Sequence, residues 1–199
     1  MNSMTKTDHI DTKTDHIDHI EESIRFILRE IGEDPDREGL LDTPRRVAKM
    51  YREAFSGVGI DPETALTATF AEEYDGIVIV KDISYYTFCE HHLIPFYGRV
   101  HIGYIPEGKI AGLSKFARLV ELVSKRPQVQ ERMTRQIADA IMKVLNPRGV
   151  IVSMEGTHLC MCARGVKKPG SITVTTVKKG IFQSDVALSQ EFANSVLMR

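Results

Sequence analysis

Apolar residues recur at helical spacing in the first part of the chain and predict two helices. The first runs from Ile20 to Ile31, and Gly32 follows it as a residue that commonly ends a helix. The second begins at Thr43, because threonine followed by proline is typical of a helix N-terminus, and Gly57 closes it. A helical region is therefore expected ahead of the rest of the fold.

The pattern then changes to strands. β-Branched and aromatic residues are concentrated in several segments, and one segment alternates apolar and polar positions as a half-buried strand does. The predicted strands are Ile77–Val80, Ile83–Phe88, Tyr97–Ile105, Gly149–Cys162 and Ser171–Val177.

Helical spacing returns between and after these strands. One helix is predicted from Ser114, a residue able to cap it, and a longer helix follows the break at Arg126-Pro127 and runs to about Leu145. Asp185–Arg199 is expected to form a closing helix. The order of helices, strands, two helices, strands and helix favours an α+β fold with an antiparallel sheet over a doubly wound α/β fold.

Composition is that of one globular domain with an appendage. Of 199 residues, 42% are apolar, which is enough for a core, and 26 basic against 27 acidic residues argue against binding nucleic acid through bulk charge. No apolar run is long enough to cross a bilayer, and the start of the chain lacks a signal-peptide core. We therefore expect a cytoplasmic protein with no nucleic-acid or membrane partner.

The N-terminus repeats one polar heptapeptide, at Thr5–Asp11 and Thr12–Asp18, and its histidines are expected to lie in a solvated tail. Alternatively, the seven-residue spacing of Ile10 and Ile17 would let the repeats extend the following helix upstream. We predict a low-complexity flexible tail at residues 1–19, a helical region at 20–72 and a catalytic domain at 73–199.

Groups able to bind a metal gather in two short segments. Cys89 and His92 are three residues apart, so a tight turn brings both to one cation. In the second segment His158, Cys160 and Cys162 alternate, and on a strand they would share one face. Thiolate and imidazole together are the ligand set that selects zinc.

Two zinc sites fit this pattern, and a site without metal stays open as a third interpretation. A structural site is closed by four protein ligands, which the three cysteines and His92 would supply. A catalytic site has three ligands and a water, and His91 and His158 are then spare imidazoles beside the metal.

Phosphate binding, if present, does not use a P-loop or a dinucleotide fingerprint, because neither glycine pattern occurs. Instead, cations are scattered near the predicted helix starts and after the cysteine segment. They are Arg46, Lys49, Lys115, Arg118, Arg164, Lys167 and Lys168.

Five separated motifs, in order, resemble type I GTP cyclohydrolase. They are T-P-R-R-V-A-K-M-Y at Thr43–Tyr51, C-E-H-H at Cys89–His92, G-L-S-K at Gly112–Lys115, R-P-Q-V-Q-E-R at Arg126–Arg132 and H-L-C-M-C-A-R-G at His158–Gly165. The resemblance covers the chain from about residue 20 onward and excludes the heptapeptide repeats.

The resemblance implies a zinc hydrolase that opens the imidazole ring of GTP at C8, releases formate and forms 7,8-dihydroneopterin triphosphate, the first step of tetrahydrofolate biosynthesis. It implies that Cys89, His92 and Cys160 hold Zn²⁺, with Cys162 outside the ligand set. His158, assisted by His91, would transfer protons.

The remaining family roles concern the substrate. Glu131 would bind the guanine N1–H and amine, Gln130 would frame the base, and Ser114 would assist the sugar rearrangement. The triphosphate would be bound by Arg46, Lys49, Lys115, Arg118 and Arg164.

For the fold, the resemblance implies a tunnelling fold, in which a four-stranded antiparallel sheet carries a helix pair on one face. Such sheets join between subunits into a barrel, and two stacked pentamers form a homodecamer with active sites between subunits. Alternatives are another enzyme of this fold, such as a three-histidine pterin synthase or a cysteine-dependent nitrile reductase, and a zinc-stabilised binding module whose closed site includes Cys162.

Overall fold

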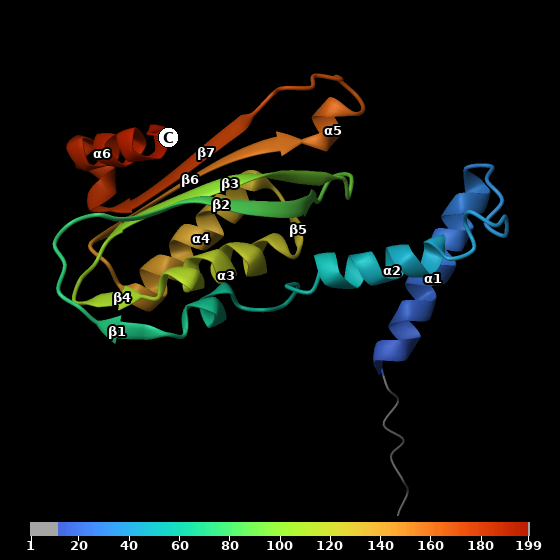
Figure 1. Ribbon diagram of the computed structural model, residues 1–199, viewed down its shortest axis with the longest axis horizontal. Coiled ribbons are helices and arrows are strands. Elements are labelled where there is room, and N and C mark those ends of the chain that lie inside the picture. Colours follow the sequence, from blue (N-terminus) through green and yellow to red (C-terminus); the bar gives the residue numbers. More distant parts are fainter. Residues whose placement is uncertain (1–11, 199) are drawn as a thin grey trace, which may run out of the picture. The chain divides into compact units, whose positions relative to one another are not determined.

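The structure is a computed structural model that describes residues 12–198 and divides into two compact units, one reaching to Glu53 and one starting at Ala54 (Figure 1). The first unit contains helix α1 (Thr12–Glu30) and all but the last residue of helix α2 (Thr43–Ala54). Both confirm helices predicted from apolar spacing, and Gly32 follows α1 with a left-handed φ of 84°.

α1 begins earlier than the apolar stripe suggests. It includes the second heptapeptide copy, Thr12–Asp18, whose backbone is helical. The first copy, Thr5–Asp11, lies outside the described residues, so the predicted tail is described only in part. None of the helices within residues 12–198 combines the length and the apolar character needed to span a bilayer.

The second unit is built on one sheet of five strands in the order β5-β2-β3-β6-β7. Neighbours among the four long strands are antiparallel, whereas the short β5 runs parallel to β2, so the sheet is mixed. The α+β class is confirmed, and β5 is an addition to the four expected strands. The strands are β2 (Val78–Cys89), β3 (Pro95–Ile105), β5 (Pro127–Gln128), β6 (Gly149–His158) and β7 (Thr173–Gly180).

The two strands predicted at 77–80 and 83–88 are one strand with an irregularity. The pairing of β2 with β3 shifts between Val80 and Ile83, and Asp82 there has a φ of 61°. The backbone N–H of Asp82 donates to His101 Nδ1 over 3.2 Å. A bulge bends a strand without ending it, so the sequence break at residues 81–82 does not separate two elements.

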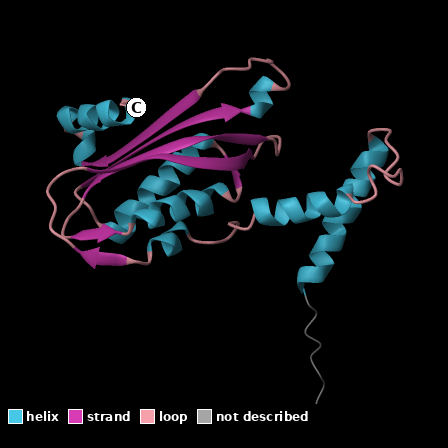
Figure 2. Ribbon diagram, viewed as in Figure 1, coloured by secondary structure: helices cyan, strands magenta, loops and turns pink. Residues whose placement is uncertain are grey.

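Two helices cover one face of the sheet and a third covers part of the other (Figures 1 and 2). α3 (Leu113–Ser124) lies against β2, and α4 (Gln130–Leu145) lies against β6 and β7. On the opposite face α6 (Val186–Leu197) buries Phe192 against Ile151. Each such side chain contributes about 1.5–3 kcal/mol when fully buried.

The starts of α6 and α3 compare differently with the sequence. Asp185 caps α6, its carboxylate accepting from the Leu188 N–H over 3.0 Å. Gly112, not Ser114, occupies the N-cap of α3, so Ser114 lies inside the first turn. The smaller elements are η1 (Pro62–Leu66), β1 (Thr69–Ala71), β4 (Lys109–Ala111) and η2 (Ile181–Gln183).

The predicted strand through Cys162 is wrong. β6 ends at His158, and α5 (Leu159–Cys162) is one helical turn. The pairing of β6 with β3 stops at His158 opposite Phe96, near the start of β3. Beyond that point the backbone has little of β3 left to pair with, and it satisfies its polar groups locally in a turn. His158, Cys160 and Cys162 therefore do not share one face of a strand.

Candidate metal centre

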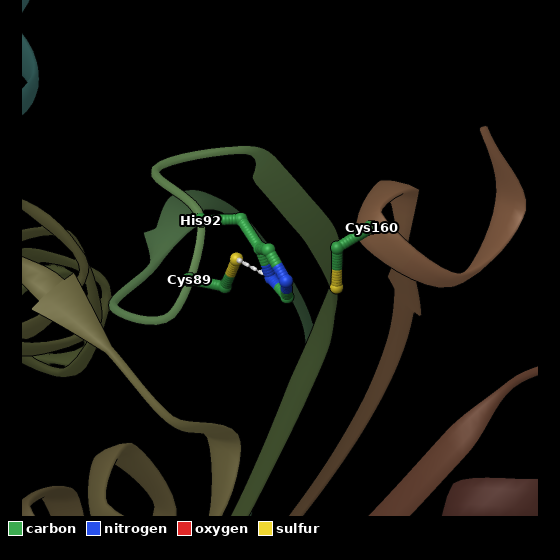
Figure 3. A group of neighbouring side chains, drawn as sticks. All are labelled: Cys89, His92 and Cys160. Carbon is green, nitrogen blue, oxygen red and sulfur yellow. Dashed lines mark hydrogen bonds between the residues drawn. The ribbon is translucent and has the colours of Figure 1, made fainter. Parts of the chain in front are cut away.

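Cys89, His92 and Cys160 converge at one end of the sheet (Figure 3). Their ligand atoms all lie within 4.8 Å of one another, and Cys89 Sγ is 3.8 Å from His92 Nδ1. Cys89 is the last residue of β2, His92 lies in the following turn, and Cys160 comes from α5.

A tight turn after β2 brings the first two ligands together. The N–H of Cys89 donates to the Ile94 carbonyl over 3.0 Å, and the N–H of Leu93 donates to the Cys89 carbonyl over 2.9 Å. Leu93 adopts a φ of 50°, which reverses the chain toward β3. The three-residue spacing of Cys89 and His92 thus acts as predicted from the sequence.

The donor set fits zinc. Two sulfurs and one imidazole nitrogen are ligands that favour Zn²⁺ over hard cations. Cys89 is buried, Cys160 is partly buried and His92 is exposed, so the group is open on one side. Burial, followed by the neighbouring Cys89, raises the pKa of the Cys160 thiol, and a bound divalent cation would offset this by favouring the thiolate.

Cys162 is not part of this group. Its Sγ donates to the Lys168 carbonyl over 3.8 Å, and among residues 12–198 the atoms placed to bind one ion belong to Cys89, His92 and Cys160. The arrangement favours the three-ligand site over the closed four-ligand site.

His158 lies beside the metal ligands in a defined environment. Its Nε2 is 2.9 Å from Gln130 Oε1, and its ring stacks on Phe96 with centroids 4.3 Å apart. Burial lowers the pKa of the His158 imidazole, and the nearby carboxylate of Glu131 opposes that shift. His158 and Glu131 are therefore brought together, as the predicted roles require.

Gln130 is buried and hydrogen-bonded within the protein. Its side chain is 1% exposed, and its amide donates to carbonyl groups of β6 and β7. Its Oε1 lies 2.9 Å from His158 Nε2. Its contact with His158 was not predicted from the sequence.

An ion pair joins the metal-binding turn to α4. Arg132 pairs with Glu90, and its Nε donates to Gln128 Oε1 over 3.1 Å. The Arg132 guanidinium lowers the pKa of the Glu90 carboxyl below its usual range. The Glu90 N–H also donates to the Gln128 carbonyl over 3.0 Å. Sequence reasoning missed Arg132, whose only signal was its place in the R-P-Q-V-Q-E-R motif.

Two further predicted residues lie beside the ligands. Arg164 Nη1 is 2.7 Å from His92 Nε2. The exposed ring of His91 stands edge-to-face with that of His92, with centroids 6.2 Å apart. Both side chains therefore lie beside a metal ligand, and their roles stay predictions.

Ser114, Lys115 and Arg118 are not brought to this centre. They lie in the first turns of α3, which follows β4 and the Ile105 end of β3. The metal ligands sit at the Pro95 end, and eleven residues of strand separate the two ends, roughly 30 Å. Arg46 and Lys49 belong to the first unit, where Arg46 pairs with Asp42 over 3.1 Å.

Comparison with known proteins gives one family. The sequence profile of GTP cyclohydrolase I matches residues 20–197. GTP cyclohydrolase 1 of Carboxydothermus hydrogenoformans is 60% identical over 173 residues, covering 86% of this chain and 90% of that protein. GTP cyclohydrolase 1 of Streptococcus pyogenes serotype M18 is 57% identical over 172 residues, covering 86% of this chain and 89% of that protein. The crystal structure of the archaeosine synthase QueF-Like in the apo form aligns with a TM-score of 0.46 and 17% identity, covering 54% of this chain and 97% of that chain.

Proposed function

The chain belongs to the GTP cyclohydrolase I family, and we propose that it opens the imidazole ring of GTP at C8. The reaction is a zinc-dependent hydrolysis that releases formate and forms 7,8-dihydroneopterin triphosphate, the first step of tetrahydrofolate biosynthesis. The observation that supports it most strongly is the convergence of Cys89, His92 and Cys160 in a chain 60% identical to a GTP cyclohydrolase 1.

Cys89, His92 and Cys160 would hold Zn²⁺ with one position left for water. The bound ion supplies Lewis-acid chemistry that lowers the pKa of water from about 15.7 toward 7. The open side of the group, at the exposed His92, gives substrate a way in.

His158 is assigned the proton transfer to guanine N7, assisted by His91. Protonation of N7 makes C8 more electrophilic, and histidine suits the transfer because its pKa lies near neutrality. The stack on Phe96 and the bond to Gln130 hold the His158 ring in one orientation. Such fixed geometry favours transfer to a bound base.

Glu131 is assigned to recognise guanine. A carboxylate accepts hydrogen bonds from both the N1–H and the exocyclic amine, and adenine does not offer that pair of donors. Glu131 is exposed at the start of α4 and close enough to His158 to influence its charge. Specificity would follow because a mismatched base leaves polar groups unpaired.

The triphosphate site is proposed to be shared between subunits. Arg164 stands beside the metal ligands, whereas Ser114, Lys115 and Arg118 lie at the other end of the sheet. A second copy would bring its α3 to this metal centre, as expected for a tunnelling-fold barrel and a homodecamer of two pentamers. Arg46 and Lys49 are assigned to the same phosphates.

β7 supports this assembly. It is an edge strand of the sheet, so its outer backbone N–H and C=O groups have no partner strand within the sheet. A strand from a second subunit would pair with these groups. The division into a helical region at 20–72 and a catalytic domain at 73–199 stays a prediction, as does the cytoplasmic location.

Incubation of the zinc-loaded protein with GTP tests the function, with the pterin measured by its fluorescence after oxidation. ATP, which lacks the guanine donors, is the matched control. Pterin from GTP and none from ATP is the expected result, and absence of pterin from both would remove the proposal.

A further inference from the structure

The orientation of the Gln130 side-chain amide is fixed by its partners. Three acceptors surround its nitrogen Nε2 and share its two hydrogens: the Met154 carbonyl at 3.2 Å, the Thr173 carbonyl at 3.0 Å and Thr175 Oγ1 at 3.1 Å. Backbone carbonyls only accept hydrogen bonds, so the amide end that faces them must be the NH₂ group. Oε1 therefore points the other way, toward His158.

This orientation determines which nitrogen of His158 carries hydrogen. Gln130 Oε1 is only an acceptor, so the 2.9 Å contact requires His158 Nε2 to donate. A neutral imidazole has one N–H, which leaves Nδ1 with the free lone pair. Stacking on Phe96 at an interplanar angle of 10° fixes the plane of the ring as well.

The space around Gln130 holds the amide in place. A Cβ at Gly156 would lie 2.5 Å from Gln130 Oε1 and 2.6 Å from Tyr85 Oη, so any side chain at position 156 would displace the Gln130 amide or the Tyr85 hydroxyl. The fully buried Thr134 supports the far side, its Oγ1 lying 2.6 Å from Thr175 Oγ1. With Gln130 only 1% exposed, its amide is covered by these contacts.

We propose that Gln130 is a positioning residue that acts through His158: it holds the ring as the Nε2–H tautomer in one orientation, with Nδ1 as its free nitrogen. This inference rests on the proposed function and replaces the base-framing role that the family resemblance implied for Gln130.

Gln130→Met tests the proposal, and Gln128→Met is the matched control. Both glutamines are buried in the same segment with bonded amides, Gln128 Nε2 donating to the Val123 carbonyl over 2.9 Å. Only Gln130 contacts His158. The two variants therefore remove the same group at the same depth. Gln128→Met also loses the bonds to Gln136 and Arg132, whereas only Gln130→Met loses the bond to His158.

The direct readout is solid-state NMR of zinc-loaded protein with ¹⁵N- and ¹³C-labelled histidine, with His158 assigned by difference from His158→Asn. The proposal predicts hydrogen on Nε2 alone in the unmodified protein and in Gln128→Met, and a mixture of tautomers in Gln130→Met. Hydrogen on Nδ1 in the unmodified protein overturns it. That result does not depend on the folding of Gln130→Met, because it requires only the unmodified protein and the His158→Asn variant used for assignment.

Steady-state kinetics distinguish a positioning role of Gln130 from a direct contact with the base. Loss of a positioning partner lowers kcat, here by about 10–100-fold, with little change in KM for GTP. Loss of a base contact raises KM with kcat unchanged, and that outcome would overturn the proposal. Absence of GTP turnover by the unmodified protein would instead refute the proposed function and leave the tautomer result readable.

Discussion

Arg164 donates a hydrogen bond from Nη1 to Nε2 of His92 over 2.7 Å, while Nδ1 of the same ring faces Cys89. A nitrogen that accepts carries no hydrogen, so Nδ1 is the protonated nitrogen in this arrangement. A metal bound through Nδ1 would move the hydrogen to Nε2 and end the bond to Arg164. The guanidinium would then be available to a phosphate.

We expect Arg164→Met to weaken GTP binding without loss of zinc. A hydrogen bond to a charged group contributes about 1.5–3 kcal/mol, so KM for GTP should rise roughly tenfold to a hundredfold. Arg135→Met, on an exposed position of α4, is the control. Metal analysis and steady-state kinetics measure both effects, and zinc loss in Arg164→Met would contradict the assignment.

The cysteines of α5 should behave differently from each other. Cys160→Ser is expected to lose zinc and activity, because its sulfur lies within the ligand group. Cys162→Ser should keep both, because its sulfur contacts the Lys168 carbonyl instead. Metal content per chain, measured on each variant purified without a His-affinity step, distinguishes the three-ligand site from a four-ligand site. A zinc-free Cys162→Ser protein would indicate a closed four-ligand site.

Glu131→Gln should impair recognition of guanine more than it affects zinc. The amide keeps one acceptor but presents an NH₂ group to one of the two base donors, which costs about 1.5–3 kcal/mol, or roughly 10- to 100-fold in kcat/KM. The measurement is the kcat/KM of zinc-loaded variant and unmodified protein with GTP. An unchanged value would exclude Glu131 from the base site.

Mixing two inactive variants tests the shared site. His158→Ala should retain zinc but lose about 10²–10⁴ in rate, the usual contribution of a general acid or base. Lys115→Glu should repel the triphosphate at the start of α3. If each site combines one subunit's His158 with another's Lys115, co-expression restores part of the activity. No recovery in mixed oligomers would place both residues in one subunit's site.

The sequence predicted most of the elements because their patterns are local. Apolar spacing located α1, α2 and α4, and alternation located β3. β5 was missed because two residues carry no period, and its pairing with β2 comes from a distant segment. The short pair β1 and β4 was missed for the same reason.

At the site, spacing identified the metal ligands but not their surroundings. Cys89 and His92 lie on a tight turn as expected, whereas Cys160 lies on a helical turn and not on a strand. The ladder with β3 ends at His158, and no pattern in the local sequence reports where a partner strand begins. The bond from His158 to Gln130 depends on the docking of α4 against β6, which is a tertiary property.

Turnover as a function of zinc content tests the central claim most directly. Protein stripped of metal by a chelator is returned to graded amounts of zinc, and formate and pterin are measured with GTP. We predict that both products rise together with bound zinc and level off at about one ion per chain, as expected for a single three-ligand site. Equal turnover by metal-free protein, or full zinc occupancy with neither product formed, would contradict the account.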